Sequence, residues 1–287
     1  MLKTAPQRTT SLSTRGLREF DRRGLIAFFV VAFTLSWSWA APIVVAERVV
    51  RQGEGWPTHF PSLLGPLLAA FGVTAWRTGA SGVRDLIGRM VAWRADWRSW
   101  VVATSPGLFL IVALIVATIV GSLPDVDDFG RFSGLPSIGV LGVVALIVAV
   151  NSFGEEAGWR GVALPHLQQR FHALPATLIL AGLWALWHAP FFLILANYQD
   201  IGVGLIVVFV LGLTSGAVVL TWLYNHSGGS ILLPVVWHGL YNVAAGTAAA
   251  SGVVAATVTA MVMVHGGVLV WLEIRARLTH RPSVMGP

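Results

Sequence analysis

Long apolar runs separated by short polar connections dominate this chain from residue 25 onward. A helix needs roughly 20 apolar residues to cross the hydrocarbon core of a bilayer. Runs of about this length predict membrane-spanning helices, and we expect eight of them, the second and fourth being short. The runs are Leu25–Ala46, Phe60–Trp76, Trp100–Leu123, Ile138–Phe153, Leu174–Ala196, Gly202–Tyr224, Ile231–Ala250 and Val253–Leu272. The expected fold is an all-α polytopic membrane helix bundle.

The charges between the runs predict the orientation of the bundle, because positively charged connections usually stay on the cytoplasmic side of a membrane. Basic residues gather before the first run, between the second and third, and after the last. They are Lys3, Arg8, Arg15, Arg18, Arg22 and Arg23, then Arg77, Arg84, Arg89, Arg94 and Arg98, then Arg275, Arg277 and Arg281. We therefore expect both termini in the cytoplasm, with basic tails at residues 1–24 and 275–287 around a bundle at 25–274.

The overall composition supports an integral membrane protein and excludes some kinds of chemistry. Hydrophobic residues make up 55% of the 287 residues and charged residues only 11%, with a mean hydropathy of +0.74. The chain has no cysteine, which excludes disulfides and thiolate-held zinc. Because the basic residues flank apolar runs, we expect a lipid bilayer and no nucleic acid as partner. The preference for Arg over Lys favours a bacterial cytoplasmic membrane.

Two adjacent carboxylates and an arginine stand after the fourth run, in Glu155-Glu156-Ala-Gly-Trp-Arg160. A carboxylate near hydrocarbon is costly and usually has a chemical role. If the helix continues, Glu156 and Arg160 are four residues apart and form an ion pair. Glu155 is then rotated by about 100° and is free to act as a base. Taken alone, these residues are explained about as well by capping of a helix end.

Two later runs carry polar groups of their own. His188 lies in the fifth run, while His238 and Asn242 share one helix face in the seventh because they are four residues apart. Each alone is explained by a hydrogen bond between packed helices, which is common in membranes. Because the three polar groups occur together, and nearly every other run lacks one, we predict a single buried polar site built from three helices.

The depths of the two histidines along their runs leave a question open. At a rise of about 1.5 Å per residue, His238 lies about 10 Å from the start of its run and His188 about 21 Å. The two levels agree only if the fifth helix begins outside the hydrocarbon or is strongly tilted.

The polar residues between about 150 and 245 resemble the motifs of the CAAX prenyl endopeptidase family, also called the CPBP or Abi family of intramembrane proteases. The family carries Glu-Glu-x-x-x-Arg, then an aromatic residue four before a histidine, then His-x-x-x-Asn. The similar residues are Glu155, Glu156 and Arg160 for the first motif, Trp184 and His188 for the second, and His238 and Asn242 for the third. At the second motif, Trp184 stands where the family usually has Phe.

The resemblance implies an intramembrane endopeptidase that hydrolyses a peptide bond near the cytoplasmic membrane face. The implied catalytic residues are Glu155, His188, His238 and Asn242, and the implied supporting residues are Glu156, Arg160 and Trp184. Glu155 would be the general base that activates a water held by His188. The other two catalytic residues would stabilise the oxyanion. The implied substrate is a peptide or a membrane protein.

The resemblance leaves two mechanisms for activating the water. Glu155, His188 and His238 could bind zinc through oxygen and nitrogen atoms, which zinc accepts as ligands. The His-Glu-x-x-His pattern of many zinc proteases is absent, although separate helices can also supply ligands. We favour a water activated by the glutamate without a metal.

Two other functions fit part of the pattern. In a proton-coupled transporter, Glu155 and His188 would form a proton relay. Such a protein should show repeat symmetry or paired broken helices, and the sequence shows neither convincingly. A non-catalytic binding or scaffold relative is the second alternative, and intact polar residues at every motif position argue against it.

Overall fold

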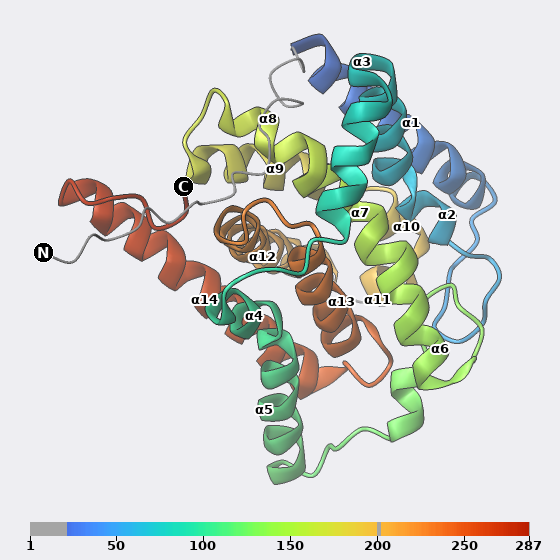
Figure 1. Ribbon diagram of the computed structural model, residues 1–287. Helices are drawn as coiled ribbons and strands as arrows, with labels where there is room; N and C mark the ends of the chain where they lie inside the picture. Colours follow the sequence, from blue (N-terminus) through green and yellow to red (C-terminus); the bar gives the residue numbers. More distant parts are fainter. Residues whose placement is uncertain (1–21, 200–201, 287) are drawn as a thin grey trace, which may run out of the picture.

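The computed structural model describes residues 22–199 and 202–286. Over these residues the chain folds into helices joined by connections of different lengths, with isolated β-bridges and no strand (Figure 1). The expected all-α bundle is therefore confirmed. Most of the predicted basic N-terminal tail, residues 1–21, lies outside the described residues, and the cytoplasmic position of both termini stays a prediction.

Five helices in the described part of the chain are long and apolar enough to cross a membrane. They are α1 (Arg22–Val45), the continuous helix Gly139–Gln168, the helix Ala173–Ile194, α12 (Ile206–His226) and α14 (Gly252–Leu278). A sixth span results if α4 (Trp97–Ala103) and α5 (Ser105–Ile119), which are bent by 44°, count as one.

Two of the long helices are composite. The helix Gly139–Gln168 consists of α6 (Gly139–Leu146), the π-helical turn η3 (Ile147–Ser152), α7 (Phe153–Gly158), the π-helical turn η4 (Trp159–Ala163) and α8 (Leu164–Gln168). The helix Ala173–Ile194 consists of α9 (Ala173–Trp187) and α10 (Phe191–Ile194). Short turns in the connections are η2 (Val126–Gly130), α11 (Ala196–Gln199) and η5 (Val203–Leu205).

The expected count of eight spans is not confirmed, and two runs account for most of the difference. The second run forms α2 (Phe60–Leu63) and the first part of α3 (Gly65–Met90), which kinks at Gly79, where φ is +66°. Beyond this kink α3 carries charged residues. The seventh run forms α13 (Leu232–Gly246), which at 15 residues is short for a span. Both helices nevertheless pack inside the bundle.

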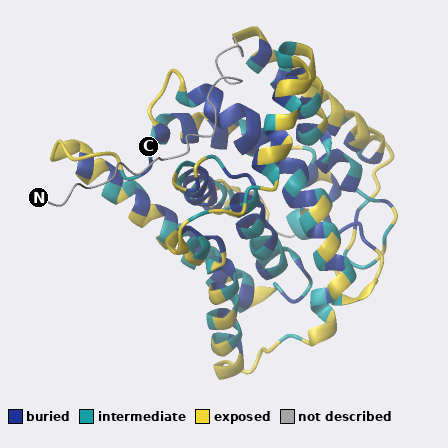
Figure 2. Cartoon of the chain, in the orientation of Figure 1, coloured by how far each residue is buried: buried dark blue, intermediate teal, exposed yellow. Residues whose placement is uncertain are grey.

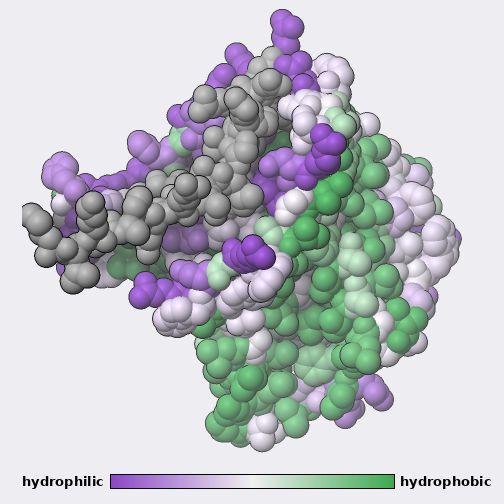
Figure 3. Space-filling model, viewed as in Figure 1, coloured by the Kyte–Doolittle hydropathy of each residue, from purple (hydrophilic) through white to green (hydrophobic). Residues whose placement is uncertain are grey.

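Large apolar side chains cover the outer faces of several helices. On α5 and α14, examples with exposed fractions between 47% and 66% are Leu108, Ile111, Ile115, Val264 and Val268. Figure 3 shows hydrophobic residues over the centre and lower part of one face, with hydrophilic residues gathered toward the upper end. Soluble proteins rarely expose apolar surface on this scale. These faces are suited to lipid, as in an integral membrane protein.

The connection before α4 shows how one polar residue begins a helix beside an apolar run. Asp96 is the N-cap of α4, and its Oδ1 accepts a hydrogen bond from the backbone N–H of Ser99 at 2.7 Å. Hydrogen bonds from Ser99 lower the pKa of the Asp96 carboxyl below its usual value. The cap satisfies one of the free amides at the start of the helix.

Glycines bring α7 into the centre of the bundle. A Cβ on Gly154 would lie 2.5 Å from the carbonyl oxygen of Leu63, and one on Gly158 would lie 2.6 Å from Cβ of Pro66. Residues without a Cβ let two helices approach closely in a membrane. Buried residues fill the middle of the bundle (Figure 2), and α7 contributes Gly154 through Gly158 to them. The segment with both predicted carboxylates is thus held against α3.

We predict that Gly158→Ala destabilises the bundle by about 1–3 kcal/mol, because the added methyl overlaps Pro66 and forces α7 from α3. The matched control is Gly182→Ala in α9, where a Cβ would meet nothing within 4 Å. Alanine favours a helix, so the control should keep or raise stability by up to about 1 kcal/mol. Thermal unfolding in detergent measures both, and a Gly158→Ala midpoint equal to that of the control would contradict the packing.

Candidate active site

Glu155 and Glu156 lie within a continuous helix and not after the end of a span. The fourth expected run stops at Phe153, whereas the helix continues to Gln168. That prediction of the boundary was wrong because charged residues were taken to mark a membrane surface, while here they are buried in the protein. Glu155 is 3% exposed and Glu156 is fully buried. The π-helical turns η3 and η4 flank them, and π-turns often occur at functional sites.

The Glu156 carboxylate joins two of the three motifs directly. Its Oε1 accepts a hydrogen bond from Nη1 of Arg160 at 2.9 Å, which is the ion pair expected from their spacing. The same oxygen accepts one from Nδ1 of His238 on α13 at 2.8 Å. Because Nδ1 donates to a carboxylate, the unshared nitrogen of His238 is Nε2. Glu156 therefore orients the imidazole from the third motif.

Trp184 is the residue that touches the largest number of the others. Its indole Nε1–H donates to Oε2 of Glu155 at 2.7 Å. The guanidinium carbon of Arg160 lies 4.8 Å from the centroid of the Trp184 ring. The His238 ring meets it edge-on at 5.6 Å, and the His188 ring lies at 5.7 Å. One aromatic side chain thus packs against four of the predicted site residues.

His188 is the C-cap of α9, at the turn that precedes Pro190. Its Nδ1 donates to the carbonyl oxygen of Trp184 at 2.7 Å, so Nε2 is the nitrogen without this partner. Trp187 and Phe209 surround the ring, with centroids at 4.9 Å and 5.5 Å. The rings of His188 and His238 both pack against Trp184, whose indole N–H donates to Glu155. Glu155 and the two imidazoles therefore belong to one buried cluster.

Asn242 follows His238 by one helical turn, but its side chain bonds to a residue outside the three motifs. Its Nδ2 donates to Oδ1 of Asn151 at 2.8 Å, and Asn151 lies one turn before Glu155. This contact uses one N–H of Asn242, and the hypothesis that Asn242 and His238 aim donors at one point stays a prediction. Asn151, which is 7% exposed, was missed in the sequence. Its spacing of four from Glu155 on an apolar helix was the available signal.

His188 and His238 lie at a similar depth because α13 begins inside the bundle and not at its end. The end of α8 and the start of α9 lie at the same end of the bundle. At a rise of about 1.5 Å per residue, Glu155 lies about 20 Å from this end and His188 about 22 Å from it. Ile231, which precedes α13, packs against Gly161, whose level is about 10 Å below the same end. His238 lies about 10 Å further along. All three side chains therefore lie at a similar level.

The three residues named as zinc ligands do not form a ready metal centre. Among the described residues, no group of three His, Asp or Glu side chains is arranged to hold a metal ion. Glu155 Oε2 already accepts from Trp184, and both imidazoles use Nδ1 for protein partners. Nε2 of each imidazole is left over, and a histidine that binds metal through Nε2 commonly donates its Nδ1–H to a carbonyl or carboxylate. Zinc binding therefore stays a prediction, and we derive no step through a metal.

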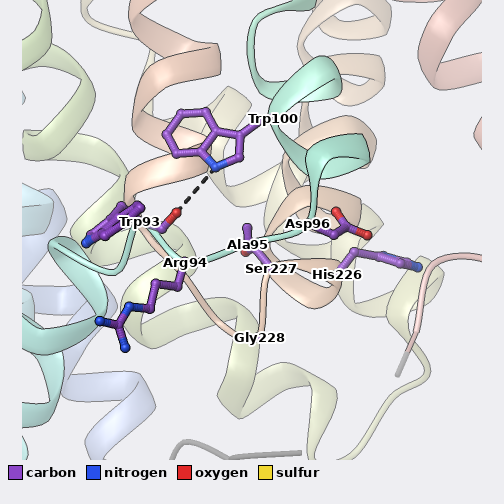
Figure 4. Close-up of a pocket in the computed structure, with 8 residues that line it drawn as sticks. All are labelled: Trp93, Arg94, Ala95, Asp96, Trp100, His226, Ser227 and Gly228. Carbon is purple, nitrogen blue, oxygen red and sulfur yellow. Dashed lines mark hydrogen bonds between the residues drawn. The ribbon is translucent and has the colours of Figure 1, made fainter.

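A pocket of about 490 Å³ lies elsewhere, between the connection that joins α3 to α4 and the turn after α12 (Figure 4). Trp93, Arg94, Trp100 and His226 are among the residues that line it. Trp100 Nε1 donates to the carbonyl oxygen of Trp93 at 3.3 Å. No residue of the three motifs lines this pocket, so it is separate from the buried polar cluster.

We predict that Glu156→Ala costs about 3–5 kcal/mol of stability, because it leaves Arg160 buried without its carboxylate. The matched control is Asp128→Ala, which removes an ion pair with Arg131 whose side chains are 31% and 52% exposed. An exposed pair of this kind is worth at most about 1 kcal/mol. Unfolding midpoints in detergent compare the two, and equal losses would show that the Glu156 pairing carries no special weight.

Two comparisons with known proteins match the segment that carries these residues. The family model described as type II CAAX prenyl endopeptidase Rce1-like matches residues 136–244. A curated relative, the CAAX prenyl protease 2 of Methanococcus maripaludis, is 28% identical over 229 residues, which cover 76% of this chain and 80% of the relative. The resemblance carried by the three motifs is thereby confirmed, because residues 136–244 of this membrane protein are similar to the Rce1-like CAAX prenyl endopeptidases.

Proposed function

We propose that the protein is an intramembrane endopeptidase in which Glu155 activates the water that cleaves a peptide bond. The observation that carries this proposal is the buried cluster itself. A carboxylate that is 3% exposed is held by Trp184 at 2.7 Å, beside two imidazoles that each have one nitrogen to spare. A carboxylate and donors around one point are what hydrolysis by an activated water requires.

In the proposed reaction, Glu155 takes a proton from a water molecule whose oxygen attacks the carbonyl carbon of the substrate peptide. His188 helps to hold this water through Nε2. The tetrahedral intermediate then collapses, the C–N bond breaks, and the proton on Glu155 passes to the leaving amine. The water supplies both the hydroxyl of the new carboxyl group and the proton of the new amine, so atoms and charge balance.

The proposed oxyanion donors are His238 and Asn242. His238 donates to Glu156 through Nδ1, and a carboxylate in this position stabilises the ring when Nε2 also carries a proton. Asn242 uses one of its N–H groups for Asn151 and has a second one on the same nitrogen. Both residues lie on one face of α13, one helical turn apart. Glu156 and Arg160 hold this arrangement in place.

We further propose that the site is reached from the end of the bundle that carries the basic connection between α3 and α4. This end would face the cytoplasm under the positive-inside rule. The Arg-rich composition supports a bacterial cytoplasmic membrane as the location. The proposed substrate is a peptide or membrane protein whose cleaved bond enters the bundle at the level of Glu155. A proton-coupled transporter and a scaffold are the alternatives that the following experiment separates.

We predict that Glu155→Gln lowers cleavage of a membrane peptide library by about 10²–10⁴-fold, because the amide keeps the shape of the side chain but cannot accept the proton. Purified protein in lipid nanodiscs is suited to the measurement. The matched control is Glu54→Gln, a change at an exposed carboxylate, which should leave cleavage unchanged. Equal cleavage by the Glu155 variant and the wild type would remove the base assignment, and proton-driven uptake into proteoliposomes without cleavage would favour the transporter.

A chelator tests whether a metal takes part. The proposed step uses only Glu155 and water, so we expect full cleavage after incubation with a strong zinc chelator and dialysis. Cleavage that is lost on this treatment and recovered with added zinc would contradict the metal-free mechanism and support Glu155, His188 and His238 as ligands. A zinc protease of known chelator sensitivity, assayed in the same nanodiscs, shows that the treatment removes metal.

A further inference from the structure

Arg89 is a buried hub at the end of α3, although its sequence context groups it with the basic residues of a connection. Its side chain is 9% exposed, whereas Arg84 on the same helix is exposed. Nη1 of Arg89 donates to the carbonyl oxygen of Gly161 at 2.8 Å and to the Tyr224 hydroxyl at 3.2 Å. Nε donates to Oδ2 of Asp85 at 2.9 Å. Three acceptors from three helices thus converge on one guanidinium.

The backbone around Arg89 fastens the start of α13 as well. The carbonyl oxygen of Arg89 accepts a hydrogen bond from the N–H of Ile231 at 2.9 Å. Ser230 donates from its hydroxyl to the carbonyl oxygen of Ala92 at 2.6 Å. Ile231 also packs against Gly161, where a Cβ would lie 3.0 Å from its Cδ1. The end of α3, the turn η4 and the start of α13 are therefore joined at one place.

Both segments that Arg89 joins lead directly to the polar cluster. Gly161 follows Arg160, which pairs with Glu156, within the π-helical turn η4. Ile231 is the N-cap of α13, the helix that carries His238. A shift between these two segments would change the contact of 2.8 Å between His238 and Glu156. Within the described part of the chain, the hydrogen bonds of the Arg89 side chain go to Asp85, Gly161 and Tyr224 and not to a motif side chain, so its influence on the motifs runs through the backbone of η4 and α13.

We propose that Arg89 is a positioning residue for the hydrolysis, which holds η4 and the start of α13 in the register that the cluster needs; this inference rests on the proposed function. Arginine suits the task because its planar group carries five donors in a rigid fork, whereas lysine offers one compact charge. A displacement of about 1 Å by a residue far from the chemistry can cost on the order of 10²-fold in rate. Loss of the Gly161 contact permits such a displacement.

The test compares Arg89→Met and Arg89→Lys with Arg84→Met, a matched change at an exposed arginine on the same helix. Each variant is purified as monodisperse protein in nanodiscs, and kcat and KM for a cleaved peptide are measured per folded molecule. We expect Arg89→Met to lower kcat by about 10–100-fold with KM little changed. Arg89→Lys should recover part of the loss, and Arg84→Met should behave as wild type. Wild-type kcat in folded Arg89→Met protein would overturn the inference.

Amide hydrogen exchange provides a readout that does not depend on activity. In Arg89→Met protein, exchange should rise in peptides that cover residues 159–166 and 231–238, and in Arg84→Met protein it should not. Unchanged exchange in both peptides would overturn the positioning role, whether or not the protein cleaves. If exchange rises while wild-type protein cleaves nothing, the proposed function fails and the structural link through Arg89 stands. The two failures are therefore distinguishable.

Discussion

A buried carboxylate in an apolar bundle requires partners, and the arrangement of the site depends on how Glu156 obtains them. Removing an ion from water costs several kcal/mol, which only close charges and hydrogen bonds offset. Arg160 comes from the next turn of the same long helix, but His238 comes from α13, 82 residues further along the chain. The helices must therefore pack so that both reach one oxygen. This requirement ties the first and third motifs to a single geometry.

Trp184 connects the second motif to the first and third motifs through ring packing and a hydrogen bond, and not through an ion pair. A phenylalanine, the usual residue in the family pattern, would supply an aromatic ring for Arg160 and the imidazoles. The indole adds an N–H, which here donates to Glu155 at 2.7 Å. The departure from the family pattern thus preserves the aromatic packing and gives the proposed base a defined orientation. A buried polar group with a partner is stable where an unpaired one would be costly.

Irregular backbone allows these side chains to meet at one depth. The π-helical turns beside α7, the kink of α3 at Gly79 and the recessed start of α13 each depart from a regular span. Because α13 begins about 10 Å inside the bundle, its seventh residue reaches the level of Glu155. Such irregular segments are tolerated in membranes where protein surrounds them. Their presence around one cluster fits a site that several helices must build together.

The sequence by itself determined the class of fold, the motif residues and the pairing of Glu156 with Arg160, because hydropathy and helical spacing are local properties of the chain. It could not determine the number of spans or the end of the fourth one. The sequence alone does not distinguish a charge at a membrane surface from a charge that is paired inside a bundle. Only the tertiary structure decided that Trp184 donates to Glu155, that Asn242 pairs with Asn151, and that Arg89 donates to the carbonyl oxygen of Gly161. Each of these contacts joins residues that lie far apart in the chain, and packing alone brings them within hydrogen-bonding distance.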